Sequence, residues 1–84
     1  MRKYIDQFLS HLEVEKNYSS HTLLNYKIDL EEFSVFLGKT PLKEVDYSVF
    51  RRFLAQIRGR SLKPRSIARK LSSLRSFFKF LFQF

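Results

Sequence analysis

Apolar residues recur at helical spacing in four successive segments of this chain, and that periodicity limits the fold more than any other feature. A stripe that returns every three to four residues predicts an amphipathic helix with one buried face. The segments are joined by short connections, so we expect the helices to fold back on one another as a compact all-α bundle. They cover about residues 2–16, 19–37 and 46–58, and the last starts between residues 61 and 65 and runs to residue 84.

The helix expected over residues 19–37 differs from the others because it carries two apolar stripes. Two stripes indicate burial against two neighbours, so this helix should be central. Its main stripe is Leu23, Tyr26, Leu30, Phe33 and Leu37, and its second is Leu24, Ile28 and Val35. The inward residues predicted for the other helices are Ile5, Phe8, Leu9 and Leu12; Val49, Phe50, Phe53, Leu54 and Ile57; and Ile67, Leu71, Leu74, Phe78 and Leu81.

Helix boundaries are marked by few residues, which makes them easy to assign. Ser19 or Ser20 is placed to cap the second helix, and Asp46 is placed to cap the third. Gly38 and Gly59 each follow a periodic run, where a residue in the left-handed conformation often ends a helix.

Length and composition favour one small domain. A chain of 84 residues can bury a single core, and it contains no cysteine, which excludes a disulfide framework and fits a cytoplasmic protein. No apolar run approaches the roughly 18 residues of a membrane-spanning helix. The N-terminus also lacks the apolar stretch of a signal peptide. We therefore expect one soluble, cytoplasmic domain over residues 1–84 with no membrane association.

The charge of the chain is strongly asymmetric. Residues 1–50 hold six basic and eight acidic side chains, whereas residues 51–84 hold ten basic and no acidic ones. Such an asymmetry produces a one-sided positive field that attracts phosphate polymers or anionic membranes. A basic segment kept only for solubility is the alternative, but this segment is strongly periodic rather than of low complexity.

The polar residues of the last helix gather on one side. A merely solvated face would mix both signs of charge and pair Glu with Lys four residues apart, and no carboxylate occurs here. The row is about 21 Å long at 1.5 Å per residue, and the major groove of DNA admits such a helix. It consists of Arg65, Arg69, Ser72, Ser76 and Lys79, with Arg75 at its flank.

The first turns of the second helix carry a smaller polar group, namely Ser19, Ser20, His21, Thr22 and Asn25. Free backbone N–H groups at a helix N-terminus attract anions. Capping explains one of the serines. The remaining residues are candidate phosphate or base contacts, or ordinary surface residues.

No pattern typical of catalysis or of cofactor binding occurs in the sequence. His11 and His21 fall on different predicted helices, without cysteine or carboxylate neighbours at metal-site spacing. Glu31 and Glu32 are adjacent and point in different directions on a helix, so they form no acid–base pair. A glycine-rich phosphate loop is also missing. We expect no metal, no cofactor and no enzymatic activity in these 84 residues.

Two long motifs resemble a known family. Residues 18–37, YSSHTLLNYKIDLEEFSVFL, are similar to the pattern S-x-x-T-x-x-x-Y-x-x-D-L-x-x-F-x-x-F-L of the N-terminal core-binding domain of tyrosine recombinases, the Xer-like and phage-integrase group. Residues 66–81, SIARKLSSLRSFFKFL, resemble the last helix of that domain, S-x-x-R-x-L-S-x-L-R-x-F-x-x-F-L. Because the intervening TPLKEVDYSVFRRFL supplies the expected loop and third helix, the resemblance covers essentially the whole chain.

The resemblance implies a four-helix SAM-like orthogonal bundle of two helical hairpins, whose second and fourth helices face duplex DNA as half of a clamp. It assigns DNA cleavage to a separate C-terminal catalytic domain that is absent from these residues. The implied partners are double-stranded DNA, that catalytic domain of the same protein and other recombinase protomers on the DNA. The implied DNA contacts are Ser20, Thr22, Asn25, Arg65, Arg69, Ser72, Ser73 and Arg75, and helical projection adds Lys79.

Two other functions remain open at this point. In a SAM-like protein interaction module, the basic helix would meet an acidic partner and use Phe80 and Phe84 as anchors, since both lie on or near its polar side. These aromatics either fold back on the bundle or pack against protein outside these residues. Association with an anionic membrane is weaker, because Leu71, Leu74 and Phe78 are needed in the core.

Overall fold

Four α-helices and one short 3₁₀ helix form residues 1–82, the part of the chain that the computed structural model describes. No strand occurs in that part. The elements are α1 (Arg2–Val14), α2 (Ser20–Leu37), η1 (Leu42–Glu44), α3 (Tyr47–Arg58) and α4 (Pro64–Leu81). The all-α prediction is confirmed, and the helix boundaries lie within a few residues of those expected.

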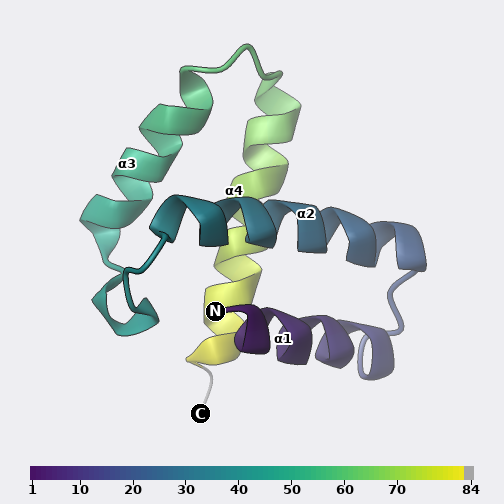
Figure 1. Cartoon of the computed structure of the whole chain (residues 1–84). Coiled ribbons are helices and arrows are strands. Elements are labelled where there is room, and N and C mark those ends of the chain that lie inside the picture. Colours follow the sequence, from purple (N-terminus) through teal and green to yellow (C-terminus); the bar gives the residue numbers. More distant parts are fainter. Residues whose placement is uncertain (83–84) are drawn as a thin grey trace.

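The helices form two hairpins that cross each other (Figure 1). In Figure 1, α1 and α2 run antiparallel across the molecule, and α4 passes behind both of them. The chain reaches α4 from α3 through the loop at the top of the view, and α3 leans away from α4 toward the C-terminal end of α2. This arrangement agrees with the SAM-like bundle that the resemblance implied, and it makes α2 the central helix.

Helix caps follow the sequence prediction closely. Ser19 is the N-cap of α2 and accepts a hydrogen bond from the backbone N–H of Thr22. Asp46 caps α3 in the same way by accepting from Val49 N–H at 3.1 Å. These contacts satisfy backbone donors that a helix N-terminus leaves free.

The two glycines behave differently from each other. Gly38 ends α2 with φ 59°, so the left-handed conformation expected there is confirmed. Gly59 has φ −71° and ψ −13°, so the same expectation was wrong at this position, which is ordinary helical backbone. A left-handed residue that the sequence did not indicate is Asn17, with φ 55°, between α1 and α2. Asparagine tolerates this conformation better than most residues do.

The core is built around aromatic rings from all four α-helices. Phe33 of α2 packs against Phe50 and Phe53 of α3 and against Phe78 of α4, with ring centroids 5.0–6.0 Å apart. Offset and edge-to-face contacts of this kind add to the stabilisation that comes from burial itself. The buried apolar residues are Ile5, Phe8, Leu12, Leu30, Phe33, Leu37, Val49, Phe53, Ile57, Leu74 and Phe77. The main stripes predicted for α1, α2 and α3 are therefore confirmed.

The second stripe predicted for α2 was wrong. Leu24, Ile28 and Val35 are 53%, 47% and 81% exposed, so this face of the helix is left open by the described residues. The helix is central because one broad face packs on α1, α3 and α4, with Leu30 and Phe33 at its middle. The three exposed residues lie on the opposite side, since helix positions repeat every 3.6 residues.

The buried face of α4 is rotated from the predicted one by roughly 70°, at 100° per residue. Of the five residues predicted to be inward, Leu74 alone is buried; Ile67, Leu71, Phe78 and Leu81 are half-buried. The face that meets the bundle contains Phe77 and also the polar residues Lys70 and Ser73. Apolar periodicity could not find this face, because the side of α4 that meets α2 is partly polar.

The aromatic residues near the end of α4 pack within the chain. Phe80 lies against Phe8 and His11 of α1, with ring centroids 5.2 and 5.0 Å apart, so it folds back on the bundle. Phe84 lies outside the described residues.

No helix within residues 1–82 is both long and apolar enough to cross a membrane.

Candidate nucleic-acid interface

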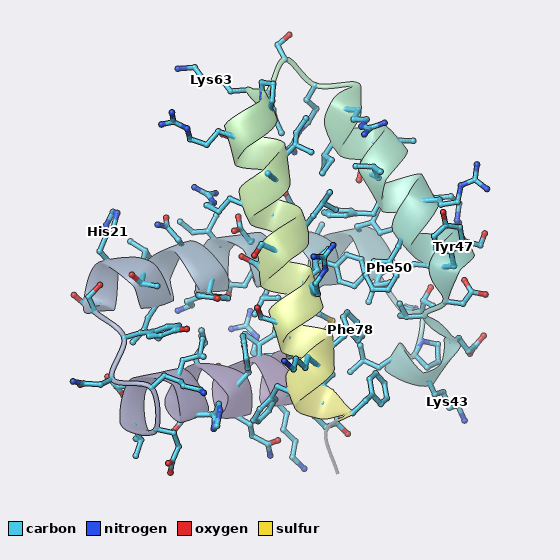
Figure 2. All side chains as sticks on the ribbon, turned by 180° about the vertical axis from the view of Figure 1, so that it is seen from behind. His21, Lys43, Tyr47, Phe50, Lys63 and Phe78 are labelled. Carbon is cyan, nitrogen blue, oxygen red and sulfur yellow. The ribbon has the colours of Figure 1, made fainter. Side chains whose placement is uncertain are left out.

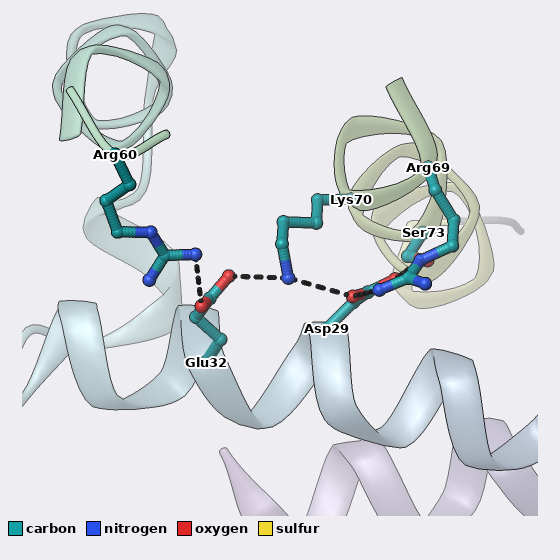
Figure 3. Close-up of polar contacts among 6 residues, drawn as sticks. All are labelled: Asp29, Glu32, Arg60, Arg69, Lys70 and Ser73. Carbon is teal, nitrogen blue, oxygen red and sulfur yellow. Dashed lines mark hydrogen bonds and ion pairs between the residues drawn. The ribbon is translucent and has the colours of Figure 1, made fainter. Parts of the chain in front are cut away.

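A buried carboxylate of α2 organises the packing of α2 against α4. Asp29 is 1% exposed and lies within the first family-like motif. Its two oxygens accept hydrogen bonds from three residues of α4, Arg69, Lys70 and Ser73 (Figure 3). A buried charge is tolerated when it is paired and its lone pairs are occupied, and both conditions hold here.

Arg69 binds this carboxylate with a two-pronged contact. Its Nε donates to Asp29 Oδ2 at 3.1 Å, and its Nη2 donates to Oδ1 at 2.9 Å. These hydrogen bonds raise the pKa of Arg69 above its ordinary value, against a smaller opposing effect of burial. About 44% of the side chain remains exposed. Three of the five guanidinium N–H groups are therefore left for another acceptor.

Lys70 extends the cluster toward α3. Its side chain is only 8% exposed, and its Nζ lies 3.3 Å from Asp29 Oδ1 and 3.0 Å from Glu32 Oε1. The latter contact is an ion pair without good hydrogen-bond geometry. Arg60, which follows α3, donates to the other oxygen of Glu32 at 2.8 Å. Figure 3 shows the chain of contacts from Arg60 through Glu32 and Lys70 to Asp29.

Two opposing effects act on the pKa of Glu32. Partial burial raises it, but the interactions with Lys70 and Arg60 together outweigh burial and hold the pKa below its ordinary value. This carboxylate therefore loses its proton more readily than an unpaired glutamate does.

These contacts divide the basic residues of the second half of the chain into two groups. Arg60, Arg69 and Lys70 are paired with the two α2 carboxylates Asp29 and Glu32. The other seven make no ion pair within residues 1–82: Arg51, Arg52, Arg58, Lys63, Arg65, Arg75 and Lys79. The positive charge that remains free thus lies on the outer surfaces of α3 and α4.

The outward face of α4 is the more continuous of these surfaces. Arg65, Ser72, Arg75 and Lys79 are all exposed, and α4 lies in front of the other helices when the molecule is viewed from behind (Figure 2). No carboxylate occurs on α4, and the ones that contact it, Asp29 and Glu32, are already paired. An anion that approaches this face therefore meets cations and hydroxyl groups.

The start of α2 supplies a second set of polar groups. Ser20 and His21 are exposed, and Asn25 is half-buried. The Thr22 hydroxyl lies 3.0 Å from the capping hydroxyl of Ser19, so the two share a hydrogen bond and one of their two O–H donors is left for another acceptor. His21 points outward from this end of α2 (Figure 2).

The residues expected to contact DNA therefore occupy three kinds of position. Ser73 is 5% exposed and donates to Asp29, so it lies inside the bundle with its hydroxyl engaged. Arg69 is shared between the cluster and the surface. The others lie at the surface or at its edge: Ser20, Thr22, Asn25, Arg65, Ser72, Arg75 and Lys79.

Sequence reasoning missed the four partners that neutralise one another across the helices, namely Asp29, Glu32, Arg60 and Lys70. A usable sign was present for Asp29, because it stands three residues after Tyr26 and four before Phe33, on the edge of the main apolar stripe of α2. No group of three or more metal-binding side chains is assembled within residues 1–82.

Comparison with known proteins adds an independent observation. The family model described as "Phage integrase, N-terminal SAM-like domain" matches residues 5–83. Tyrosine recombinase XerC of Anoxybacillus flavithermus is 46% identical over 80 residues, which are 92% of this chain and 27% of that protein. No solved structure matches the chain significantly.

Two further relatives give the same picture. Tyrosine recombinase XerC of Thermodesulfovibrio yellowstonii is 47% identical over 81 residues, or 94% of this chain and 26% of that protein. The Bacillus subtilis protein of that name is 39% identical over 84 residues, or 96% of this chain and 28% of that protein. The chain therefore spans little more than a quarter of the length of these relatives.

Proposed function

The chain belongs to the family of phage integrase N-terminal SAM-like domains, and from that premise we propose that it is the DNA-binding domain of a site-specific tyrosine recombinase. In this proposal, α4 and the start of α2 bind duplex DNA, and the domain closes one side of a clamp around the recombination site. The outward face of α4 carries the proposal, since it presents free cations with no carboxylate among them.

Each residue type on this face suits a different part of the duplex. Arg65, Arg75 and Lys79 supply the charge that displaces counterions from phosphates. Arginine also matches the acceptor edge of guanine in the major groove. Ser72 lies between them without bulk, so the helix backbone can approach the bases closely. The row from Arg65 to Lys79 is about 21 Å long, which is more than the groove width of about 12 Å.

The start of α2 would hold the domain in register on the DNA. Ser20, Thr22 and Asn25 present hydroxyl and amide groups next to the positive end of the helix dipole, which favours phosphate contacts. Arg69 lies between the two helices and would donate its free N–H groups to the same duplex. Asp29 would hold the Arg69 guanidinium in the orientation needed for this contact.

The relatives are recombinases about three and a half times as long as this chain, so the chemistry is proposed to belong to another domain of the same protein. That domain and further recombinase protomers on the DNA are the proposed protein partners. The proposal places the protein in the cytoplasm, where its DNA is.

Removing charge from the α4 face tests the proposal. The double variant Arg65→Gln/Arg75→Gln should lose affinity for a mixed-sequence duplex, and its salt dependence should become less steep by about 0.9 for each phosphate that is no longer neutralised. Fluorescence anisotropy at several salt concentrations measures both quantities. Arg69 is left unchanged, because replacing it would also disturb Asp29.

The matched control is Lys3→Gln/Lys43→Gln, which removes the same charge from exposed positions on α1 and η1. If both double variants lose the same affinity, the binding is a general charge effect and the α4 face is not the interface.

A protein interaction role has one observation in its favour, the exposed apolar stripe of Leu24, Ile28 and Val35 on α2. The aromatic anchors expected for that role give it less support, because Phe80 is packed against α1. A salt-sensitive complex with an acidic protein, without duplex binding at low salt, would favour this function over DNA binding.

A further inference from the structure

An aromatic cleft opens where α1, α2 and α4 meet. Its walls include His11 from α1, Tyr26 from α2, Ser76 and Lys79 from α4, and Lys16 and Tyr18 from the loop between α1 and α2. No carboxylate is among the described residues that line it. We propose that this cleft is a second phosphate-binding site, which holds the DNA backbone near the C-terminal end of α4, whereas Arg65 lies near the N-terminal end. This inference rests on the proposed function.

The polar groups of the cleft are free to bind a ligand. Tyr18 and Tyr26 stack with ring centroids 6.1 Å apart, so their two rings belong to one wall of the site. Within residues 1–82, no side-chain hydrogen bond or ion pair engages Tyr18, Tyr26, Lys16 or Lys79. Two ammonium groups together with hydroxyl donors form the set of partners from which a phosphodiester accepts hydrogen bonds.

The aromatic rings give one of these donors, the Tyr26 hydroxyl, a fixed and partly dry setting. Tyr26 packs edge-on against Phe8 at 5.6 Å, and Phe80 packs against His11 at 5.0 Å. Tyr26, His11 and Phe80 are half-buried, whereas the two lysines stay exposed at the rim. A charge held against an apolar wall interacts more strongly than the same charge in bulk water.

Helix geometry connects the cleft with the α4 face. Ser72, Ser76 and Lys79 stand at positions i, i+4 and i+7, so they lie on one side of α4. Ser76 is about 16 Å along the helix from Arg65 at 1.5 Å per residue. The major groove is about 12 Å wide, so a helix bound across it would have Arg65 near one strand and the cleft near the other. Ser72 and Arg75 would then face the bases between them.

The test replaces groups that belong to the cleft but not to the α4 row. Lys16→Gln should lower affinity for a mixed-sequence duplex several-fold and make the salt dependence less steep by about 0.9, as expected when one phosphate is no longer neutralised. Tyr18→Phe should lower affinity with the slope unchanged, since it removes a neutral hydroxyl. Lys43→Gln on η1 is the matched control, because Figure 2 shows Lys43 on a different part of the molecule.

The outcomes separate this inference from the proposed function. If Lys16→Gln and Lys43→Gln behave alike while Arg65→Gln/Arg75→Gln still loses binding, the second site is refuted and the DNA-binding face stands. If none of these variants changes duplex affinity, both are refuted. A competition experiment then adds inorganic phosphate to the complex with duplex and compares it with chloride at equal ionic strength. It shows whether the cleft itself binds a phosphate group. If phosphate displaces duplex from Lys16→Gln as well as it does from the unchanged chain, the cleft binds no phosphate.

Discussion

Asp29 is the residue whose replacement should matter most to the bundle, because three side chains of α4 depend on it. Asp29→Asn keeps the shape of the side chain but removes the charge that compensates buried Lys70. Breaking one partner of a buried ion pair costs about 3–5 kcal/mol, and we expect a decrease of that size in the free energy of unfolding, measured by urea denaturation.

Arg69→Gln is the companion variant, and it should cost far less. Asp29 keeps its hydrogen bonds from Lys70 and Ser73, and the arginine side chain is partly exposed. Decreases of equal size in the two variants would contradict the central role of Asp29.

Glu32 gives the bundle an acid-sensitive interaction with Lys70 and Arg60. The pKa of its carboxyl is lower in the folded chain than its ordinary value of 4.5, so its contribution to stability is complete above that value. The contribution disappears as the pH falls below 4.5 and passes through the folded-state pKa. Urea denaturation at a series of pH values should show a smaller acid-induced decrease of stability for Glu32→Gln than for the unchanged chain. If the free energy of unfolding falls equally with pH in the two proteins, protonation of Glu32 does not contribute to the loss of stability in acid.

At the scale of the helices, one face of α2 stabilises the fold and the opposite face does not. Ile28→Gln and Val35→Gln alter the exposed stripe and should change the free energy of unfolding by no more than about 0.5 kcal/mol. Leu30→Ala, on the opposite face, should cost about 2–5 kcal/mol because Leu30 is fully buried. Thermal unfolding of the three variants checks this. A large decrease at Ile28 or Val35 would mean that the stripe is covered in solution, for example by a second copy.

The helices also show which structural features can be predicted from the sequence and which cannot. Caps and apolar periodicity depend on neighbours along the chain, so the Asp46 cap and the buried stripe with Leu30 were predicted correctly, and Ser19 was one of the two caps expected for α2. The inward face of α4 was not, because the buried polar residues Lys70 and Ser73 are paired with carboxylates of α2, which is distant in the sequence. A polar contact between distant segments leaves no periodic mark in either one. For the same reason Ser73 was expected at the interface, although it lies inside the bundle.

At the scale of the whole molecule, charge is sorted between the two hairpins. The carboxylate side chains all belong to the first fifty residues, and two of them pair with cations of the second hairpin. The remaining cations of α4 are left facing outward on the side seen in Figure 2. A molecule with such a field should approach a polyanion in a preferred orientation, with α4 leading.

The most direct test of that central claim is a map of backbone amide shifts when a mixed-sequence DNA duplex is added at low salt to the isotope-labelled chain. We predict that the largest shifts fall at residues 20–25 and along the outward positions of α4, from Arg65 to Lys79. Shifts centred on the outer face of α3 around Arg51, or on the α2 stripe around Ile28, would contradict it. So would a spectrum that the duplex leaves unchanged.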